Sequence, residues 1–334
     1  MFSLLIAKIR KIQQHHQSKL TGGFTLLELL VSIIIAGLIV SGLLYVVIEL
    51  IKNDRTEARL DQTQRDIQRA IDYMADDIKE AVFVYSDPTT PTVDLDSDFP
   101  NGTPVLAFWR TDPVTAFPPT CDRWATGGTD ENEAKHDECE VLKIRQASYS
   151  LVVYVQRART TTDTIWKGAS RIVRYELDKY RDSVDLVQTA GYQDPTDPEV
   201  GFERWAPSAV NTAGNGAVLV DFVDSLPGPA PSGATGYPCS DIDLGFQSDP
   251  TQPDYSVVPA GLVTEQNSSF YACVRNAGTG GISESYSNQD AYIFLRGNAV
   301  DGAQGVVNAL SDDSSLPTLK TRVLMRGVVN KNPN

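Results

Sequence analysis

The sequence predicts an α+β protein in which one long N-terminal helix packs on an antiparallel sheet, and three features carry this prediction. Leu29–Ile48 is an uninterrupted apolar run without a charged side chain. It is followed, up to about Tyr85, by a stretch that lacks Pro and Gly and has apolar residues on one helical face. Beyond Pro88, short runs of β-branched and aromatic residues alternate with loops rich in Pro, Gly and Asp, which is typical of strands.

The first 23 residues form a basic leader, because they contain four Lys or Arg side chains and no acidic one. The positive-inside rule therefore predicts a cytoplasmic N-terminus, a single span of the cytoplasmic (inner) membrane, and an extracytoplasmic position for everything after Ile51. At 1.5 Å per residue, Leu29–Ile48 covers roughly 30 Å, the thickness of a hydrocarbon core. The run is longer than a secretory signal core, and no small-residue cleavage site follows it.

The continuation of the helix is amphipathic. Ile67, Ile71, Met74 and Ile78 recur at spacings of three and four residues, opposite a charged face. We expect this stripe to pack against the head, since it is too short for the sustained heptads of a free coiled coil. The predicted parts are a cytoplasmic leader at 1–23, a transmembrane helix at 24–51, its amphipathic continuation at 52–85 and a globular β-rich head at 86–334.

Seven segments of the head are predicted strands: Val105–Arg110, Val141–Ile144, Tyr149–Gln156, Arg171–Leu177, Ala217–Val223, Ala291–Arg296 and Thr321–Val329. The third and fourth are expected to form a hairpin across the polar segment 160–168. Residues 111–140 and 224–256 lack such a pattern and are expected to be long loops, each containing at least one cysteine.

The four cysteines lie in the region predicted to be extracytoplasmic, where an even count indicates two disulfides. Three pairings are possible, and proximity in the sequence favours Cys121–Cys139 with Cys239–Cys273. Buried free thiols are the alternative. No C-x-x-C motif is present, so a zinc site or a thioredoxin-like site has little support.

The composition argues against two classes of function. The net charge is -14, which disfavours non-specific binding to nucleic acid because that binding depends on Lys and Arg. Of three histidines only His136 lies outside the leader, and it is expected to be an exposed loop residue. Phosphate-binding glycine loops and nucleophile motifs are absent, so we expect neither an enzyme nor an organic cofactor.

Calcium is a weak candidate ligand. Asp94, Asp96 and Asp98 alternate along the chain, but the spacing lacks the Gly and Glu of an EF-hand loop. Two other acidic pairs, Asp194 with Asp197 and Asp241 with Asp243, could also supply oxygen ligands. Acidic loops that only keep a surface soluble are commoner, so no metal site is assigned.

The junction between leader and apolar run reads G-G-F-T-L-L-E-L-L-V-S, and it resembles the processing site of type IV pilins and type II secretion pseudopilins. The resemblance implies cleavage by a prepilin peptidase between Gly23 and Phe24, and N-methylation of Phe24. It also implies that Glu28, with Thr25 beside it, serves assembly by compensating the N-terminal amine of a neighbouring subunit. An acidic residue at a membrane-helix centre costs roughly 2.5–3.5 kcal/mol, so such a charge calls for a partner.

The resemblance extends to the class of subunit. The large head is similar to W-type minor pilins and J-type pseudopilins, and the residues from Asp66 to Tyr85 look most like the C-type pseudopilin of cyanobacterial hormogonium polysaccharide secretion. This implies a pilin-like fold and a place at or near the tip of a filament that serves secretion or surface motility. The implied partners are other minor pilins or pseudopilins, an assembly platform and its ATPase.

Other interpretations remain open. The motif could belong to an ordinary signal anchor in which Glu28 is incidental. The protein would then be a permanently anchored, single-pass extracytoplasmic binding protein that never polymerises. A secreted enzyme using the acidic loops is a third possibility, which the single histidine of the head discourages.

Overall fold

The computed structural model describes residues 23, 25–92, 102–125, 129–208, 212–224, 239, 255–259, 269–275, 290–299 and 316–325. The chain divides into two compact units, Met1–Ala58 and Arg59–Asn334. The described part is α+β, with one long helix and antiparallel sheets, as expected. Its helices are α2 (Leu26–Lys79), α3 (Thr89–Thr92), α4 (Asp122–Ala125) and α5 (Asp130–Arg145).

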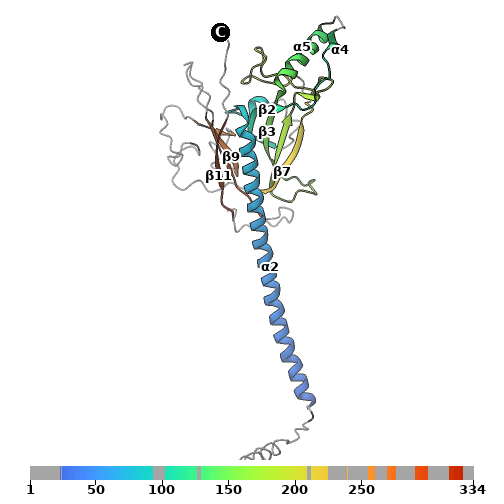
Figure 1. Ribbon diagram of the computed structural model, residues 1–334. Helices are drawn as coiled ribbons and strands as arrows, with labels where there is room; N and C mark the ends of the chain where they lie inside the picture. The colour runs from blue at the N-terminus through green and yellow to red at the C-terminus, as the bar shows by residue number, and fades with distance from the viewer. Residues whose placement is uncertain are drawn as a thin grey trace, which may run out of the picture. The chain divides into compact units, whose positions relative to one another are not determined.

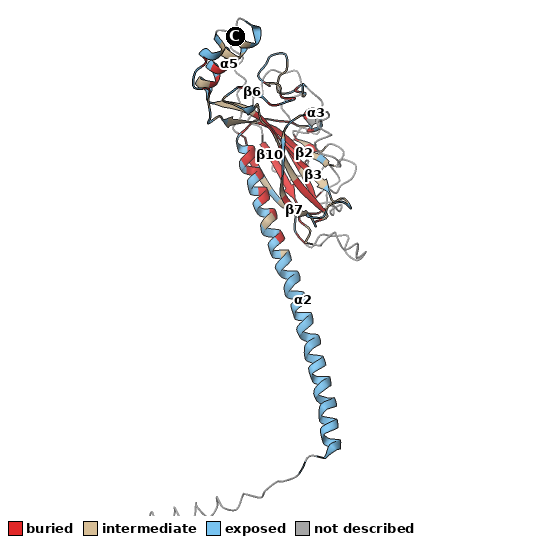
Figure 2. Cartoon of the chain, turned by 90° about the vertical axis from the view of Figure 1, so that its right-hand side faces the viewer, coloured by how far each residue is buried: buried red, intermediate tan, exposed pale blue. Residues whose placement is uncertain are grey.

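Helix α2 has two parts that differ in burial. Residues 26–59 are exposed, whereas Ile67, Ala70, Ile71, Met74 and Ile78 are at most 3% exposed. Figure 2 shows the same change, from pale blue to red, along the helix. The stripe at three- and four-residue spacing is thus the face of α2 that packs in the head, as the sequence predicts.

The helix ends earlier than the predicted residue 85. Lys79 is its last residue, and strand β1 (Ala81–Val84) follows at once. The apolar residues from Ala81 to Tyr85 fit both the spacing of a helix and the alternation of a strand, so the helical spacing did not identify their structure. The β-branched and aromatic side chains favour the strand. Phe83 in the strand and Tyr85 directly after it pack in an aromatic cluster with Trp109.

The strands after β1 are, in order, β2 (Gly102–Pro113), β3 (Ala147–Ala158), β4 (Ser170–Leu177), β5 (Tyr180–Asp182), β6 (Val187–Gln188), β7 (Asn215–Val223), β8 (Tyr255–Val258), β9 (Phe270–Arg275), β10 (Asp290–Leu295) and β11 (Leu319–Leu324). Six of them overlap predicted strands: β2, β3, β4, β7, β10 and β11. Strand β9 lies outside the predicted set. Strand β8 begins inside a stretch expected to be loop.

These strands form two principal sheets and a small one. The five-stranded sheet has the order β1-β2-β3-β4-β7, the four-stranded sheet has the order β11-β10-β9-β8, and β5 pairs with β6. Strands β3 and β4 form the predicted antiparallel hairpin, with Val153 opposite Tyr175. Figure 1 shows β9 and β11 on one side of the buried part of α2, and β2, β3 and β7 on the other.

The main core lies where the buried stripe of α2 meets both sheets. Ile71 and Met74 share it with Phe108 and Tyr154 of the five-stranded sheet and with Ile293 of the four-stranded sheet. Because a strand points alternate side chains to opposite faces, the other face of the five-stranded sheet carries a separate aromatic core. That second core includes Trp109 and Trp205, both fully buried.

The segment 111–140, expected to be a loop, contains two helices. Helix α5 begins after Thr129, whose side chain accepts a hydrogen bond from the N–H of Asn132, and ends at Gln146 in the left-handed conformation. Its acidic first turn and basic last turn complement the helix dipole. The strand predicted at Val141–Ile144 is therefore wrong, and the half-exposed His136 lies on a helix rather than in a loop.

Candidate functional site

The site that the sequence predicts lies at the start of α2. Thr25 precedes the helix, and its Oγ1 accepts a hydrogen bond from the backbone N–H of Glu28 at 3.3 Å. Its carbonyl oxygen accepts the N–H of Leu29 at 3.2 Å. Thr25 is thus the N-cap, and Glu28 occupies the first turn, where its charge lies near the positive end of the helix dipole.

The carboxylate of Glu28 points into open surroundings. Its side chain is exposed, and no described residue forms an ion pair with it. Gly23 is also surrounded by space, since a Cβ atom there would meet no atom within 4 Å. Phe24 lies outside the described residues, so the predicted processing bond between Gly23 and Phe24 stays a prediction.

The first part of α2 exposes a continuous apolar surface. Its large apolar side chains are between 45% exposed (Val31) and 84% exposed (Leu26). Two hydroxyl groups in this surface are satisfied within the helix, because Ser32 donates to the carbonyl of Glu28 at 2.7 Å and Ser41 donates to that of Gly37 at 2.8 Å. Internal satisfaction of polar groups is what a hydrocarbon environment requires.

In the described part of the chain, α2 is the one helix that is long and apolar enough to cross a bilayer. A signal sequence near an N-terminus meets the same criterion, so this observation supports membrane association without giving an orientation. The small residues Gly37 and Ser41 are four apart and lie on one face, which permits close approach of another helix.

The other end of α2 is held to the five-stranded sheet by a buried carboxylate. Asp77 is 6% exposed, and its Oδ1 pairs with Arg110 Nη1 at 2.8 Å. Its Oδ2 accepts hydrogen bonds from Arg174 Nε at 2.8 Å and from the Tyr154 hydroxyl at 2.6 Å. Burial raises the pKa of Tyr154, and the charge of Asp77 raises it further, so the phenol remains a hydrogen-bond donor.

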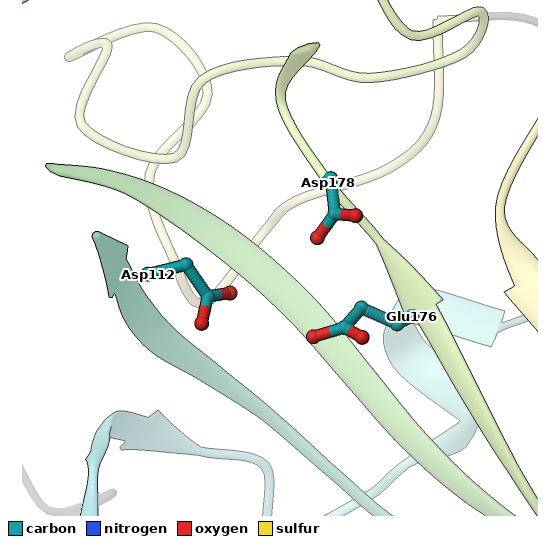
Figure 3. A group of neighbouring side chains, drawn as sticks. All are labelled: Asp112, Glu176 and Asp178. Atoms are coloured by element: carbon teal, nitrogen blue, oxygen red, sulfur yellow. The ribbon is translucent and has the colours of Figure 1, made fainter. Parts of the chain in front are cut away.

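Three more carboxylates, those of Asp112, Glu176 and Asp178, lie close together near Arg110 and Arg174 (Figure 3). One oxygen each of Asp112, Glu176 and Asp178 lies within 4.8 Å of the others. Glu176 pairs with Arg110 Nη2 at 2.9 Å and with Arg174 Nη1 at 2.6 Å, and Arg110 Nη2 also pairs with Asp112 Oδ1 at 2.5 Å. Among the described residues, Asp178 forms no ion pair within 4 Å.

This acidic cluster (Asp112, Glu176 and Asp178) has only a faint signal in the sequence. Burial raises the pKa of both Asp112 and Asp178, and the charge of Glu176 adds to the effect at each. The signal is the alternation of charges along two strands, R-T-D at 110–112 and R-Y-E-L-D at 174–178. Alternation places those side chains on one face, but it cannot show that the two strands place their charges together.

The calcium candidates named from the sequence do not form a site in the described chain. Asp94, Asp96, Asp98, Asp241 and Asp243 lie outside the described residues. Asp194 accepts hydrogen bonds from the backbone and hydroxyl of Thr196 and pairs with Lys179 at 2.9 Å. Asp197 accepts the N–H of Glu199 at 3.0 Å. Both therefore act as turn-forming acceptors.

Two disulfides are formed, Cys121–Cys139 and Cys239–Cys273, which are the pairs that sequence proximity favours. The first joins the short helix α4 region to α5. The second attaches residue 239 to strand β9. Neither pair leaves a free thiol.

A surface groove runs along α2 beside β7 in the head. It has a volume of about 550 Å³, and its lining includes Tyr73 of α2, Leu219 of β7, and Ile165 and Trp166 of the β3–β4 connection. Tyr73 is 49% exposed and Ile165 is 77% exposed. Phe222 also lines the groove and has a φ of 58°, a conformation that costs a bulky residue roughly 1–3 kcal/mol.

Comparison of the chain with protein-family models, with curated proteins and with solved structures gave no match.

Proposed function

We propose that this protein is a structural subunit of a type IV pilin-like filament, of the minor pilin or pseudopilin kind. The observation that carries the proposal is Glu28, a carboxylate in the first turn of a helix whose entire first part is apolar and exposed. The motif G-G-F-T-L-L-E around it resembles the processing site of that family. We propose no catalytic role.

The physical argument concerns the partner of Glu28. A carboxylate in a hydrocarbon environment is costly unless an opposite charge neutralises it. No described residue of this chain supplies that charge. Cleavage after Gly23 would create a primary amine at Phe24, and the amine of a neighbouring subunit would neutralise Glu28 during assembly. The N-cap at Thr25 keeps the first turn ordered, which holds the carboxylate at a fixed depth.

Two further observations support an extracytoplasmic head anchored by α2. The basic leader precedes the apolar run, which favours a cytoplasmic N-terminus and a single pass through the inner membrane. Both disulfides lie in the head, and such bonds persist in oxidising compartments. Before assembly, α2 would hold the protein in the membrane.

We further propose that the subunit occupies the tip of its filament, where a large head can cap or prime assembly. The family resemblance implies a prepilin peptidase, other minor pilins or pseudopilins, an assembly platform and an ATPase as partners. It also favours a role in secretion, of a polysaccharide in the finest form of the resemblance, or in surface motility.

The processing step is tested by the intact mass and the N-terminal peptide of the protein isolated from its native membrane. We expect loss of residues 1–23 and a methylated Phe24. Gly23→Val should block this processing without disturbing the helix, because no atom lies within 4 Å of the added Cβ. An unprocessed wild-type protein, in cells that cleave other prepilins, would contradict the proposal.

The assembly step is tested by Glu28→Ala, with Glu49→Ala as the matched control on the same helix. We expect both variants to be processed and to reach the membrane, while only Glu28→Ala fails to enter sheared filaments or to co-purify with partner subunits. Normal assembly of Glu28→Ala would remove the charge-pairing role.

The second candidate function is a permanently anchored binding protein, and the groove beside β7 favours it. Exposed Tyr73 and Ile165 border that groove, so it offers apolar surface to a ligand. This function requires that the mature protein retains the leader, whereas the filament subunit loses it. The same N-terminal mass measurement therefore separates the two.

A further inference from the structure

The groove beside β7 runs along the open edge of the five-stranded sheet. Strand β7 is the last strand of that sheet, and among the described residues it pairs with β4 on one side and forms one bridge, from Val223 to Gly297, on the other. Five consecutive residues of β7, 218–222, line the groove. Successive side chains of a regular strand point to opposite faces, so a hollow that touches every residue follows the edge of the strand and its backbone.

The backbone of this edge is incompletely paired with the sheet. Val218 and Val220 pair with two adjacent residues of β4, so Leu219 between them has no partner on that strand. A second register shift leaves one extra residue between Val220 and Val223. Such β-bulges leave the peptide groups of the extra residue unpaired. Free N–H and C=O groups at a sheet edge are a template for the backbone of another extended chain.

The end of β7 indicates the direction in which a chain fits beside it. The bridge between Val223 and Gly297 is antiparallel, and the N–H of Asn298 donates to the carbonyl of Phe222 at 2.7 Å. An antiparallel chain therefore already lies against this end of the edge. A second chain that continued in the same direction would run from Phe222 towards Asn215, with its N-terminal end at Phe222.

The groove is long enough for a short strand. It continues into a smaller hollow of about 230 Å³, with which it shares Asp66, Asp221 and Phe222. Together the two hollows extend along α2 from Arg59 to Tyr73. At 1.5 Å per residue these positions are about 21 Å apart along the helix, and six extended residues cover about the same length.

The charges of the smaller hollow favour an acidic occupant. Arg59 and Lys167 line it, and neither forms an ion pair within 4 Å in the described part of the chain. Its two carboxylates are already engaged, since Asp66 pairs with Arg69 at 3.3 Å and Asp221 accepts the backbone N–H of Lys167 at 2.9 Å. These three cations and two carboxylates leave an excess of one positive charge, on a protein whose net charge is -14.

We propose that this groove binds an extended peptide of a partner protein, which adds to β7 as an antiparallel strand. Its backbone pairs with the free peptide groups of the edge, and its apolar side chains contact Tyr73, Ile165 and Trp166. An acidic side chain near its N-terminal end pairs with Lys167 or Arg59. The bulges hinder pairing with flat strands in general, so the walls of the groove select the peptide. The inference holds for a processed or an unprocessed chain, so it stands or falls separately from the proposed assembly function.

The test is fluorescence anisotropy of the peptide D-E-V-T-V-T-V, labelled at its C-terminus and titrated with the full-length protein in detergent micelles, with empty micelles as the blank. We expect saturable binding with a Kd on the order of 10–100 μM, because a short peptide must become ordered when it binds. Two further peptides carry N-methyl groups on alternate amides, in one register or in the other. An added strand uses one set of amides, so one methylated peptide should bind about tenfold more weakly than the other. Equal affinity of the two methylated peptides would overturn strand addition.

Variants of the walls locate the peptide. Lys167→Glu should weaken binding of the acidic peptide about tenfold and should strengthen binding of K-K-V-T-V-T-V, in which the acidic residues are replaced. Tyr73→Ala changes an exposed side chain, so the head should stay folded while both peptides bind more weakly. Arg181→Glu, at an exposed position of β5, is the control and should leave both affinities unchanged.

Two results would overturn the proposal. One is the absence of saturable peptide binding to the wild type. The other is dimerisation of the protein that Tyr73→Ala abolishes and that the peptide does not inhibit, which would assign the groove to a second copy of the chain.

Discussion

The two parts of α2 differ in how far their side chains are buried within the protein, and the more apolar part is the exposed one. The apolar part, Leu26–Ile51, is exposed along its whole length, whereas the more polar part, from Thr63 to Ile78, supplies the buried residues. The polar part packs against the sheets because its apolar side chains share one face of the helix. In addition, Asp77 forms ion pairs with Arg110 and Arg174 of the five-stranded sheet. The comparison shows that packing within the head depends on apolar side chains sharing one face of the helix, whereas the apolar part presents a surface that suits a hydrocarbon environment.

The largest expected effect comes from breaking the charged contact of the buried part. Asp77→Asn would leave Arg110 and Arg174 without their shared acceptor, which should lower the free energy of unfolding by about 3–5 kcal/mol. Asp76→Asn is the control, because Asp76 pairs with Lys79 at an exposed site and should change stability by less than about 1 kcal/mol. Denaturant unfolding of the head measures both. Equal effects would mean that the ion pairs of Asp77 add nothing specific.

The next effect tests apolar packing in the two parts. Met74→Ala removes a fully buried side chain and should cost about 2–5 kcal/mol of head stability. Leu38→Ala removes a side chain that is 70% exposed, so it should leave the denaturation midpoint of the head unchanged. If Leu38→Ala destabilised the head as much as Met74→Ala, the distinction between the two parts would be wrong.

A smaller effect is expected at the helix start. Thr25→Ala removes the N-cap, which should cost about 1 kcal/mol and be confined to the first turn. Hydrogen exchange of the Glu28 amide should become about fivefold faster, while the amide of Met74 keeps its protection. Thr25→Ser should restore the slow exchange, because it keeps the hydroxyl acceptor. Faster exchange along all of α2 would contradict a local cap.

The smallest effect is a dependence on pH at the end of the buried part. The pKa of Asp112 and that of Asp178 are raised by burial, so their ionised forms destabilise the folded state. As the pH falls from 7 towards about 4.5, stability should increase by a few tenths of a kcal/mol, because both groups are partly exposed to screening solvent. The pKa of Asp194 is lowered, so the stability that its carboxylate contributes is lost as the pH falls from the ordinary range of an aspartate through the lower pKa of the folded state.

Thermal unfolding of wild type and Asp178→Asn isolates this dependence. The variant should be slightly more stable than the wild type at pH 7, and the difference should shrink at lower pH. A variant less stable than the wild type at pH 7 would show that the ionised Asp178 carboxylate stabilises the folded head.

The elements predicted correctly are those whose apolar residues follow a single spacing, either that of a helix or that of a strand. The stripe from Ile67 to Ile78 and the hairpin of β3 with β4 belong to this group. The prediction from sequence was wrong at Ala81 to Tyr85, where the apolar residues fit both a helical and a strand spacing. It was also wrong at Val141–Ile144, where a short apolar run forms the end of a capped helix instead of a strand. Strands β8 and β9 were not predicted: β8 is a four-residue run between Pro253 and Pro259, and β9 is only six residues long.

The candidate sites divide in the same way. Glu28 is recognisable in the sequence because its neighbours are apolar, so it can be identified as a candidate site without knowledge of the fold. The acidic cluster could not be found, because Asp112 and Asp178 become neighbours only through the register of three strands. The carboxylates that alternate in the sequence, Asp94, Asp96 and Asp98, lie outside the described residues, whereas Asp194 and Asp197 accept hydrogen bonds within their own turns.

The aromatic core on the outer face of the five-stranded sheet provides the molecule with an optical signal. The rings of Trp109 and Trp205 lie 5.3 Å apart at an angle of 70°, and both are fully buried, whereas Trp124 and Trp166 are partly exposed. A fixed, close pair of indoles should dominate the near-ultraviolet circular dichroism. Since Trp205 belongs to an irregular segment held by its hydrogen bond to the carbonyl of Gln193, that band would report detachment of this segment before the strands themselves separate.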